Sequence, residues 1–235
     1  MCAALTSIIS AVVGMAGGIV LLSAMTFFLA LETIVPIHGV VQLVSNGTRV
    51  AHLRKNVVSA IFVPNIVGIS VGTYISTQVI LRISNREIFY FLVAALIFYV
   101  LFKPKNLPPL KIPYYAFGFL GVLVGLLNPL IGATGPLMAP FYLRDDLSKE
   151  EIVATKASTQ TFGHLLKIPA FVYLGFDYHQ HALLITCMCF AVILGTHFGV
   201  GLLRGIKDET FRFIFRAALF IAACRVLFKA ILSLA

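Results

Sequence analysis

Long apolar segments, separated by short polar ones, follow one another along the chain. Four of them approach or exceed the roughly 20 residues that a helix needs to cross a bilayer; they lie at about 57–81, 87–102, 179–203 and 209–232. Four shorter segments form two pairs, 4–13 with 18–31 and 113–131 with 135–143. Two more, 34–50 and 152–167, are apolar but carry polar residues at helical spacing. This pattern predicts an all-α polytopic membrane protein.

The short segments of each pair meet at a cluster of glycines. The clusters are Gly14-Met15-Ala16-Gly17-Gly18 and Gly132-Ala133-Thr134-Gly135-Pro136. Each pair is either one broken helix or a re-entrant hairpin that returns to its own side. We favour hairpins, because they place most Lys and Arg residues on one side, as expected for cytoplasmic loops. Loops 51–56 and 204–208 should then be cytoplasmic, with the C-terminus outside.

The two halves of the chain are weakly similar. Residues 14–49 align without a gap on 132–167, and Gly72-Thr73 aligns on Gly195-Thr196 in a second register. Each half would contain a hairpin, re-entrant or broken, and three transmembrane helices. An odd number of crossings turns the second half upside down, a plan known from transporters. We predict two inverted repeats, 1–103 and 112–235, joined by the linker 104–111 within one membrane domain, 1–235.

Composition supports the membrane assignment and excludes other classes. Of the 235 residues, 60% are hydrophobic and 11% are charged, whereas soluble domains carry about 25% charged residues. The net charge of +9 is scattered between apolar segments, which argues against a nucleic-acid partner. No zinc spacing, phosphate-binding loop or catalytic triad order is found. We expect no enzyme activity, no metal and no cofactor.

Two polar stripes carry the candidate chemistry. The first stripe, on 34–50, comprises His38, Gln42, Asn46 and Arg49. The second stripe, on 152–167, comprises Lys156, Gln160, His164 and Lys167. Spacings of three and four place each set on one helix face. Polar groups inside a membrane usually face a partner or a cavity, so the stripes either bind a substrate or only join helices.

Lys156 points to an anionic substrate. A buried ammonium needs a counter-charge, and all nine carboxylates lie at segment ends or in short loops. The substrate itself could supply the missing charge. The alternative is that Lys156 lies near the membrane surface and extends its ammonium to water.

The glycine clusters offer a second anion-binding feature. Thr134 can cap a helix that begins at Gly135 with Pro136 in its first turn, and Gly17-Gly18 is the matching start in the first half. Such helix starts expose backbone N–H groups, although glycines also permit close helix packing. The candidate substrate-binding residues are His38, Gln42, Asn46, Lys156, Gln160, His164, Gly17, Gly18, Thr134 and Gly135.

The chain resembles the TauE/SafE sulfite exporter family in several features. These are the glycine corner, the polar helix after it, the basic residues Arg49, Arg54 and Lys55, and the repetition of this layout near residue 132. The segment Gly125–His164 is the most similar stretch. The resemblance implies a secondary transporter of sulfite, sulfonates or other sulfur-containing organic anions. We expect the substrate to bind at the midplane between the repeats, and the protein to reside in the cell membrane.

Several alternatives stay open. A non-transporting assembly or sensor protein, whose polar stripes only pack helices, would show the same patterns. The expected partners are the lipid bilayer and a small anion. A second copy of the chain, in a homodimer, is a further candidate partner.

Overall fold

The computed structural model describes residues 2–13, 17–25, 27–80 and 111–214, together with 216, 217, 220 and 224. These residues form helices and short connections, with no strand among them. The helices are α1 (Cys2–Val13), α2 (Gly17–Met25), α3 (Leu31–Leu53), α4 (Ser59–Ile80), α6 (Phe117–Ile131), α7 (Gly135–Tyr142), α8 (Lys149–Tyr173) and α9 (Ala182–Gly205). Three 3-10 turns are η1 (Arg54–Asn56), η2 (Tyr114–Ala116) and η3 (His179–His181). The predicted span 87–102, most of 209–232 and nearly all of the linker 104–111 lie outside the described residues.

Three helical segments among the described residues are long and apolar enough to cross a membrane: Ser59–Ile80, Tyr114–Ile131 and His179–Gly205. The first and third agree with predicted spans. The second agrees with the predicted segment 113–131, the first half of the second hairpin, and its 18 residues, η2 and α6 together, are long enough to cross the membrane. α3 and α8 are longer, at 23 and 25 residues, but their polar stripes lower their hydropathy.

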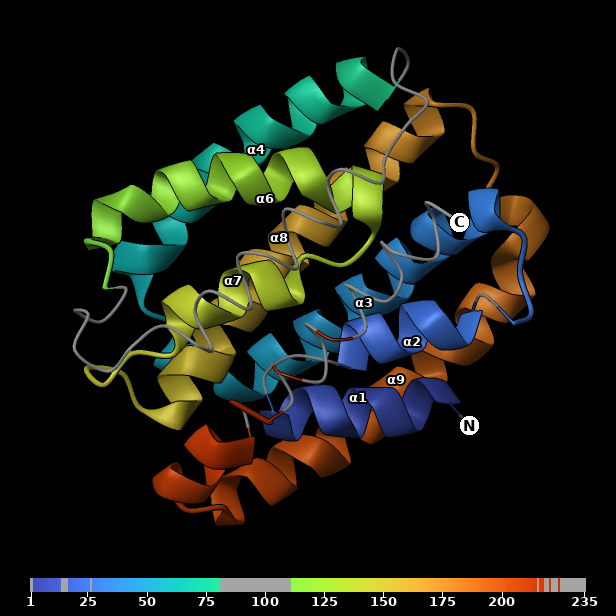
Figure 1. Cartoon of the computed structure of the whole chain (residues 1–235). Helices are drawn as coiled ribbons and strands as arrows, with labels where there is room; N and C mark the ends of the chain where they lie inside the picture. The colour runs from blue at the N-terminus through green and yellow to red at the C-terminus, as the bar shows by residue number, and fades with distance from the viewer. Residues whose placement is uncertain are drawn as a thin grey trace.

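The paired short segments fold as hairpins. Figure 1 shows the chain reversing direction between α1 and α2 and again between α6 and α7. Gly17 at the start of α2 lies so close to Thr6 and Ser10 of α1 that a Cβ there would overlap the Thr6 carbonyl oxygen. A straight helix would separate Gly17 from Thr6 by about 16 Å. The turn after α6 is made at Gly132, whose φ of +84° suits glycine.

Helices α3 and α8 run through the middle of the molecule (Figure 1) and contact each other along their length. Gly39 of α3 lies against the Lys167 side chain, and Gly47 lies against Thr161, so the two helices are antiparallel. On one side α4 packs on α6, and on the other side α1 packs on α9. The central pair is therefore the part of the described fold most enclosed by other helices.

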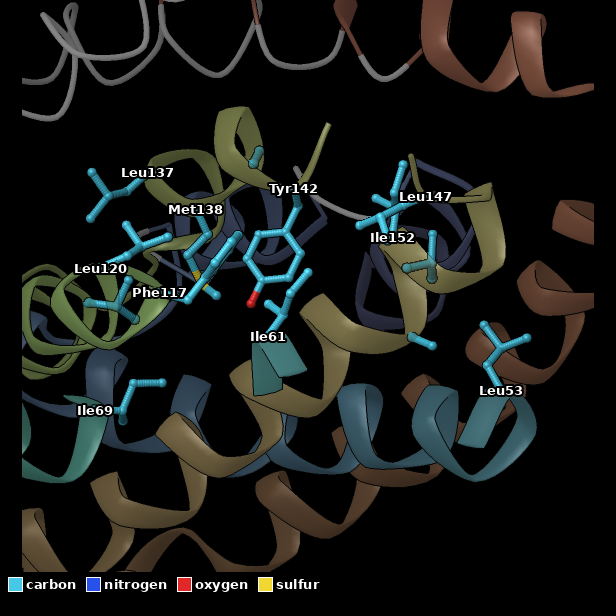
Figure 2. Packing of buried hydrophobic residues seen from close by; sticks show 14 of the residues in the cluster. Leu53, Ile61, Ile69, Phe117, Leu120, Leu137, Met138, Tyr142, Leu147 and Ile152 are labelled. Atoms are coloured by element: carbon cyan, nitrogen blue, oxygen red, sulfur yellow. The ribbon is translucent and has the colours of Figure 1, made fainter. Parts of the chain in front are cut away.

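Close glycine contacts and an apolar cluster hold the α4–α6 side together. A Cβ on Gly68 would overlap the Gly118 carbonyl oxygen, so the two backbones touch. Figure 2 shows Tyr142 of α7 among buried apolar side chains of this cluster. The Tyr142 hydroxyl accepts a hydrogen bond from Asn65 Nδ2 at 3.1 Å and lies 3.0 Å from Thr159 Oγ1. This network ties α7 to α4 and α8.

Several loops gather at the end of the molecule where α8 begins. The Val58 backbone N–H donates to Thr155 Oγ1 at 2.9 Å, and Lys149 Nζ contacts the Ile206 carbonyl oxygen. The loops that follow α3 and α9 therefore lie at the same end. In the preceding loop, Arg144 donates two hydrogen bonds to Asp146, at 2.8 and 2.9 Å. These bonds lower the pKa of the Asp146 carboxyl to about 2, so this loop contact persists across the physiological pH range.

Candidate functional site

The two polar stripes meet where α3 packs on α8. Six of the candidate residues lie on these helices, and five of them are no more than 5% exposed, whereas Gln160 is half-buried. Lys156 is 0% exposed. The alternative in which its ammonium reaches water at the membrane surface is therefore wrong. Burial follows from the fold, because α3 and α8 pack together with His38 of one polar face against His164 of the other.

The first stripe forms a chain of contacts that starts at the first hairpin. His38 Nε2 lies 2.8 Å from the Gly18 carbonyl oxygen. A carbonyl can only accept, so Nε2 carries the proton and donates it. Gly18 also lies against the Gln42 amide, and Asn46 Nδ2 donates to the Gln42 carbonyl oxygen at 2.9 Å. The stripe thus connects the start of α2 to the middle of α3.

The second stripe makes equivalent contacts with the second hairpin. Lys156 Nζ donates to Gln160 Oε1 at 3.3 Å. Gly135, the first residue of α7, lies beside both of these side chains, with a hypothetical Cβ 3.3 Å from Gln160 Nε2 and 3.7 Å from Lys156 Nζ. Glycine at this position lets Lys156 and Gln160 approach the α7 N-terminus closely. The site therefore combines side-chain donors with a helix start.

Lys167 has a different environment from Lys156. Its Nζ donates to the Gly132 carbonyl oxygen at 2.7 Å. That carbonyl belongs to the C-terminal end of α6, where the helix dipole favours a positive charge. Lys167 is also 0% exposed. Its ammonium therefore fixes the turn of the second hairpin against α8.

Two histidines join the stripes across the interface. The His38 and His164 rings meet edge to face, with centroids 5.9 Å apart. The Nδ1 atom of each ring is buried and has no hydrogen-bond partner within the described part of the chain. In the tautomer fixed by Gly18, the His38 Nδ1 atom is an acceptor, and it becomes a donor only when the ring is protonated.

The glycine-corner residues do not all lie beside the stripes. Gly18 and Gly135 contact stripe residues, whereas Gly17 faces α1, where it is needed for packing. Thr134 precedes α7 as predicted, but its side chain makes no capping hydrogen bond. The expected capping by Thr134 is wrong because its backbone, with φ −99° and ψ 8°, is not in the extended conformation of a capping residue.

Arg49, like Lys167, belongs to a polar stripe but was not among the predicted substrate-binding residues. The sequence placed it on the first stripe, three residues after Asn46, but gave no reason to prefer it over a residue near the membrane surface. In the structure Arg49 is 0% exposed, and its Nη1 donates to Asn46 Oδ1 at 2.7 Å. Its spacing from Asn46 was the available signal.

The chemistry of the interface suits an anion better than a cation. Ammonium, guanidinium and amide N–H groups predominate there, and these groups donate hydrogen bonds. Among the residues that the structure describes, no group of three His, Cys, Asp or Glu side chains could hold a metal ion. A small oxyanion matches the available donors.

Comparison with known proteins gives one match. A family model described as "Sulfite exporter TauE/SafE" matches residues 1–226 of the 235. The matched range includes both stripes and both glycine corners. No curated protein and no solved structure matches the chain.

Proposed function

Since this chain belongs to the sulfite exporter TauE/SafE family, we propose that it is a secondary transporter whose substrate is sulfite or an organosulfonate. The family is one of membrane transporters of sulfur-containing anions, and the apolar helices fit an integral membrane protein. The observation that carries the proposal is the burial of Arg49 and Lys156 where α3 meets α8. Positive charge inside a membrane is costly and usually functional, and a bound anion would offset that cost.

The proposed substrate site lies between the two stripes. The side chains of His38, Gln42, Asn46, Lys156, Gln160 and His164 surround this site, and Gly18 and Gly135 allow the substrate to approach the hairpin backbones. Gly17 and Thr134 contribute by closing the two hairpins. Gly135 supports this assignment best, because it lies beside Lys156 and Gln160 at the start of a helix, where N–H groups and the dipole favour an anion.

We propose that the protein is built from two inverted repeats, 1–103 and 112–235, joined by the linker 104–111. The reciprocal packing of α4 on α6 and of α1 on α9 supports it. So does the position of the loops that follow α3 and α9, because both adjoin the first turns of α8. Two halves of opposite orientation would place one substrate site on their common axis, near the midplane. The proposed location is the cell membrane, with no reaction catalysed.

Counterflow in proteoliposomes tests the transport function. Vesicles that contain the purified full-length protein and unlabelled sulfite or methanesulfonate should accumulate the labelled anion transiently. Empty vesicles and vesicles with a heat-inactivated protein serve as controls. Absence of counterflow for both anions, with a folded protein in the vesicles, would favour the alternative of a non-transporting assembly or sensor protein.

A further inference from the structure

We propose that the guanidinium edge formed by Nε and Nη2 of Arg49 is the principal contact for an oxyanion in this protein. This assignment rests on the proposed function, because it names the group of that site which recognises the substrate. It also predicts a selectivity by shape: anions that present two oxygens side by side should be preferred over spherical anions.

The first support is the hydrogen bonding of Arg49 itself. The side chain is 0% exposed, and Nη1 donates to Asn46 Oδ1 at 2.7 Å. Nε and Nη2 are buried without a hydrogen-bond partner among the described residues. Leaving buried N–H groups unpaired is costly. The N–H groups of Nε and Nη2 point in parallel from one edge of the guanidinium plane, so they match two oxygens of one oxyanion.

Asn46 explains how this edge is held in place. Its Nδ2 donates to the Gln42 carbonyl oxygen at 2.9 Å, and its Oδ1 accepts from Arg49 Nη1. The Asn46 amide is thus engaged on both sides within α3. We therefore assign Asn46 as a positioning residue, which fixes the Arg49 plane, rather than as a direct ligand of the substrate.

Lys167 provides an internal comparison. It occupies the position of the second stripe that aligns with Arg49 in the first, and it is equally buried. Its Nζ is bonded to the Gly132 carbonyl oxygen at the end of α6. One cation of the aligned pair is therefore used to hold the fold, while two N–H groups of the other have no such use within the described chain.

Lys156 adds a second positive charge near Arg49. Arg49 of α3 and Lys156 of α8 are both fully buried on helices that pack against each other, and Lys156 lies beside Gly135 at the start of α7. An ammonium is a compact point charge, whereas a guanidinium selects by shape. Arg49 should therefore determine which anion is preferred, and Lys156 should contribute affinity for any anion.

The test compares affinities for anions of different shape. The purified full-length protein in nanodiscs is titrated calorimetrically with sulfite, methanesulfonate and iodide. Arg49→Lys keeps the charge and removes the paired donors, so we expect methanesulfonate affinity to fall by roughly tenfold to 100-fold and iodide affinity to change by less than about threefold. Asn46→Ala should lower the ratio of methanesulfonate affinity to iodide affinity by a smaller factor than Arg49→Lys does. In this variant the Arg49 guanidinium remains, but Asn46 no longer holds it in place.

Lys167→Arg is the matched control. It replaces an ammonium with a guanidinium at the position that aligns with Arg49. It should alter thermal stability while leaving the ratio of methanesulfonate affinity to iodide affinity unchanged. An unchanged ratio in Arg49→Lys, with a parent-like unfolding midpoint, would overturn the assignment of Arg49 but leave anion transport intact. If the parent protein binds none of the three anions, the proposed function fails and this assignment fails with it.

Discussion

The three buried cations of α3 and α8 share one interface but have different surroundings. Lys167 is hydrogen-bonded to the Gly132 carbonyl oxygen, Lys156 is bonded to Gln160, and Arg49 is bonded through one of its nitrogens to Asn46. Replacing Lys167, whose hydrogen bond holds the second hairpin against α8, should lower the stability of the protein. Replacing Lys156, which lies beside the start of α7, should weaken anion binding instead.

Lys156→Gln should weaken anion binding far more than it weakens folding. Removing one partner of a buried charged contact costs about 2–5 kcal/mol, which corresponds to roughly 30-fold or more in affinity. Lys156→Arg keeps the charge with a different shape, so its affinity should be intermediate. Titration of sulfite or methanesulfonate into each purified variant measures the effect. Parent-like binding and transport by Lys156→Gln would remove Lys156 from the site.

Lys167→Met should lower thermal stability. The change removes a hydrogen bond from a charged donor to Gly132, which is worth about 1.5–3 kcal/mol, while methionine still fills the space beside Gly39. The unfolding midpoint in detergent is the measurement. Lys55→Met and Lys207→Met are matched controls, because both lysines are exposed in loops and should leave the midpoint unchanged. Equal midpoints for Lys167→Met and the controls would contradict a structural role.

At the scale of elements, the two hairpins use their glycines for different purposes. Gly17, the first residue of α2, lies against the backbone of α1. Gly135, the first residue of α7, lies against the ends of two long side chains. Backbone cannot move aside without separating the helices, but Gln160 and Lys156 can shift their terminal atoms. Added bulk should therefore disrupt packing at the first corner and the polar site at the second.

Gly17→Ala and Gly135→Ala should separate stability from binding. The methyl group of Gly17→Ala meets the Thr6 carbonyl oxygen, and overpacking of this kind typically costs about 1–3 kcal/mol. Gly135→Ala should leave the unfolding midpoint close to that of the parent but weaken anion binding. Thermal unfolding and anion titration of both variants measure the contrast. If Gly135→Ala lost as much stability as Gly17→Ala, this would count against a site in which an anion approaches the N-terminus of α7 beside Gly135.

At the scale of the whole molecule, α8 runs from one end of the helix bundle to the other. Its first turns contact the loops after α3 and α9, and its far end leads to Asp177. A helix of 25 residues spans about 37 Å, which exceeds the roughly 30 Å hydrocarbon core of a bilayer. Loops at opposite ends of α8 should therefore lie on opposite sides of the membrane.

Cysteine labelling of intact cells tests this topology. In a variant without its native cysteines, single cysteines at Arg54 and Lys207 should be protected from an impermeant reagent, and a cysteine at Asp177 should react. The excess of Lys and Arg near the first two positions is the reason to place them in the cytoplasm. Opposite labelling of positions 54 and 207 would rule out the inverted arrangement and favour parallel repeats.

Much of the local structure follows from the sequence by itself. Apolar runs set where the helices lie, because lipid requires each spanning segment to satisfy its own backbone hydrogen bonds. Spacings of three and four in the stripes fixed which side chains share a face of α3 and of α8. The glycine corners indicated where α2 and α7 begin. These features depend on neighbours in the chain, so residue types and spacings were sufficient to predict them.

The tertiary structure decided how these elements meet. The reversal at each glycine corner, the antiparallel contact of α3 with α8, and the packing of α4 on α6 all join residues far apart in the chain. Lys167 and Arg49 looked equivalent as aligned cations, but the end of α6 supplies a partner to Lys167, while two Arg49 nitrogens have no hydrogen-bond partner among the residues that the structure describes. Spacing along one helix cannot show which other helix faces it, so the partner of a buried charge becomes known only when the helices are packed together.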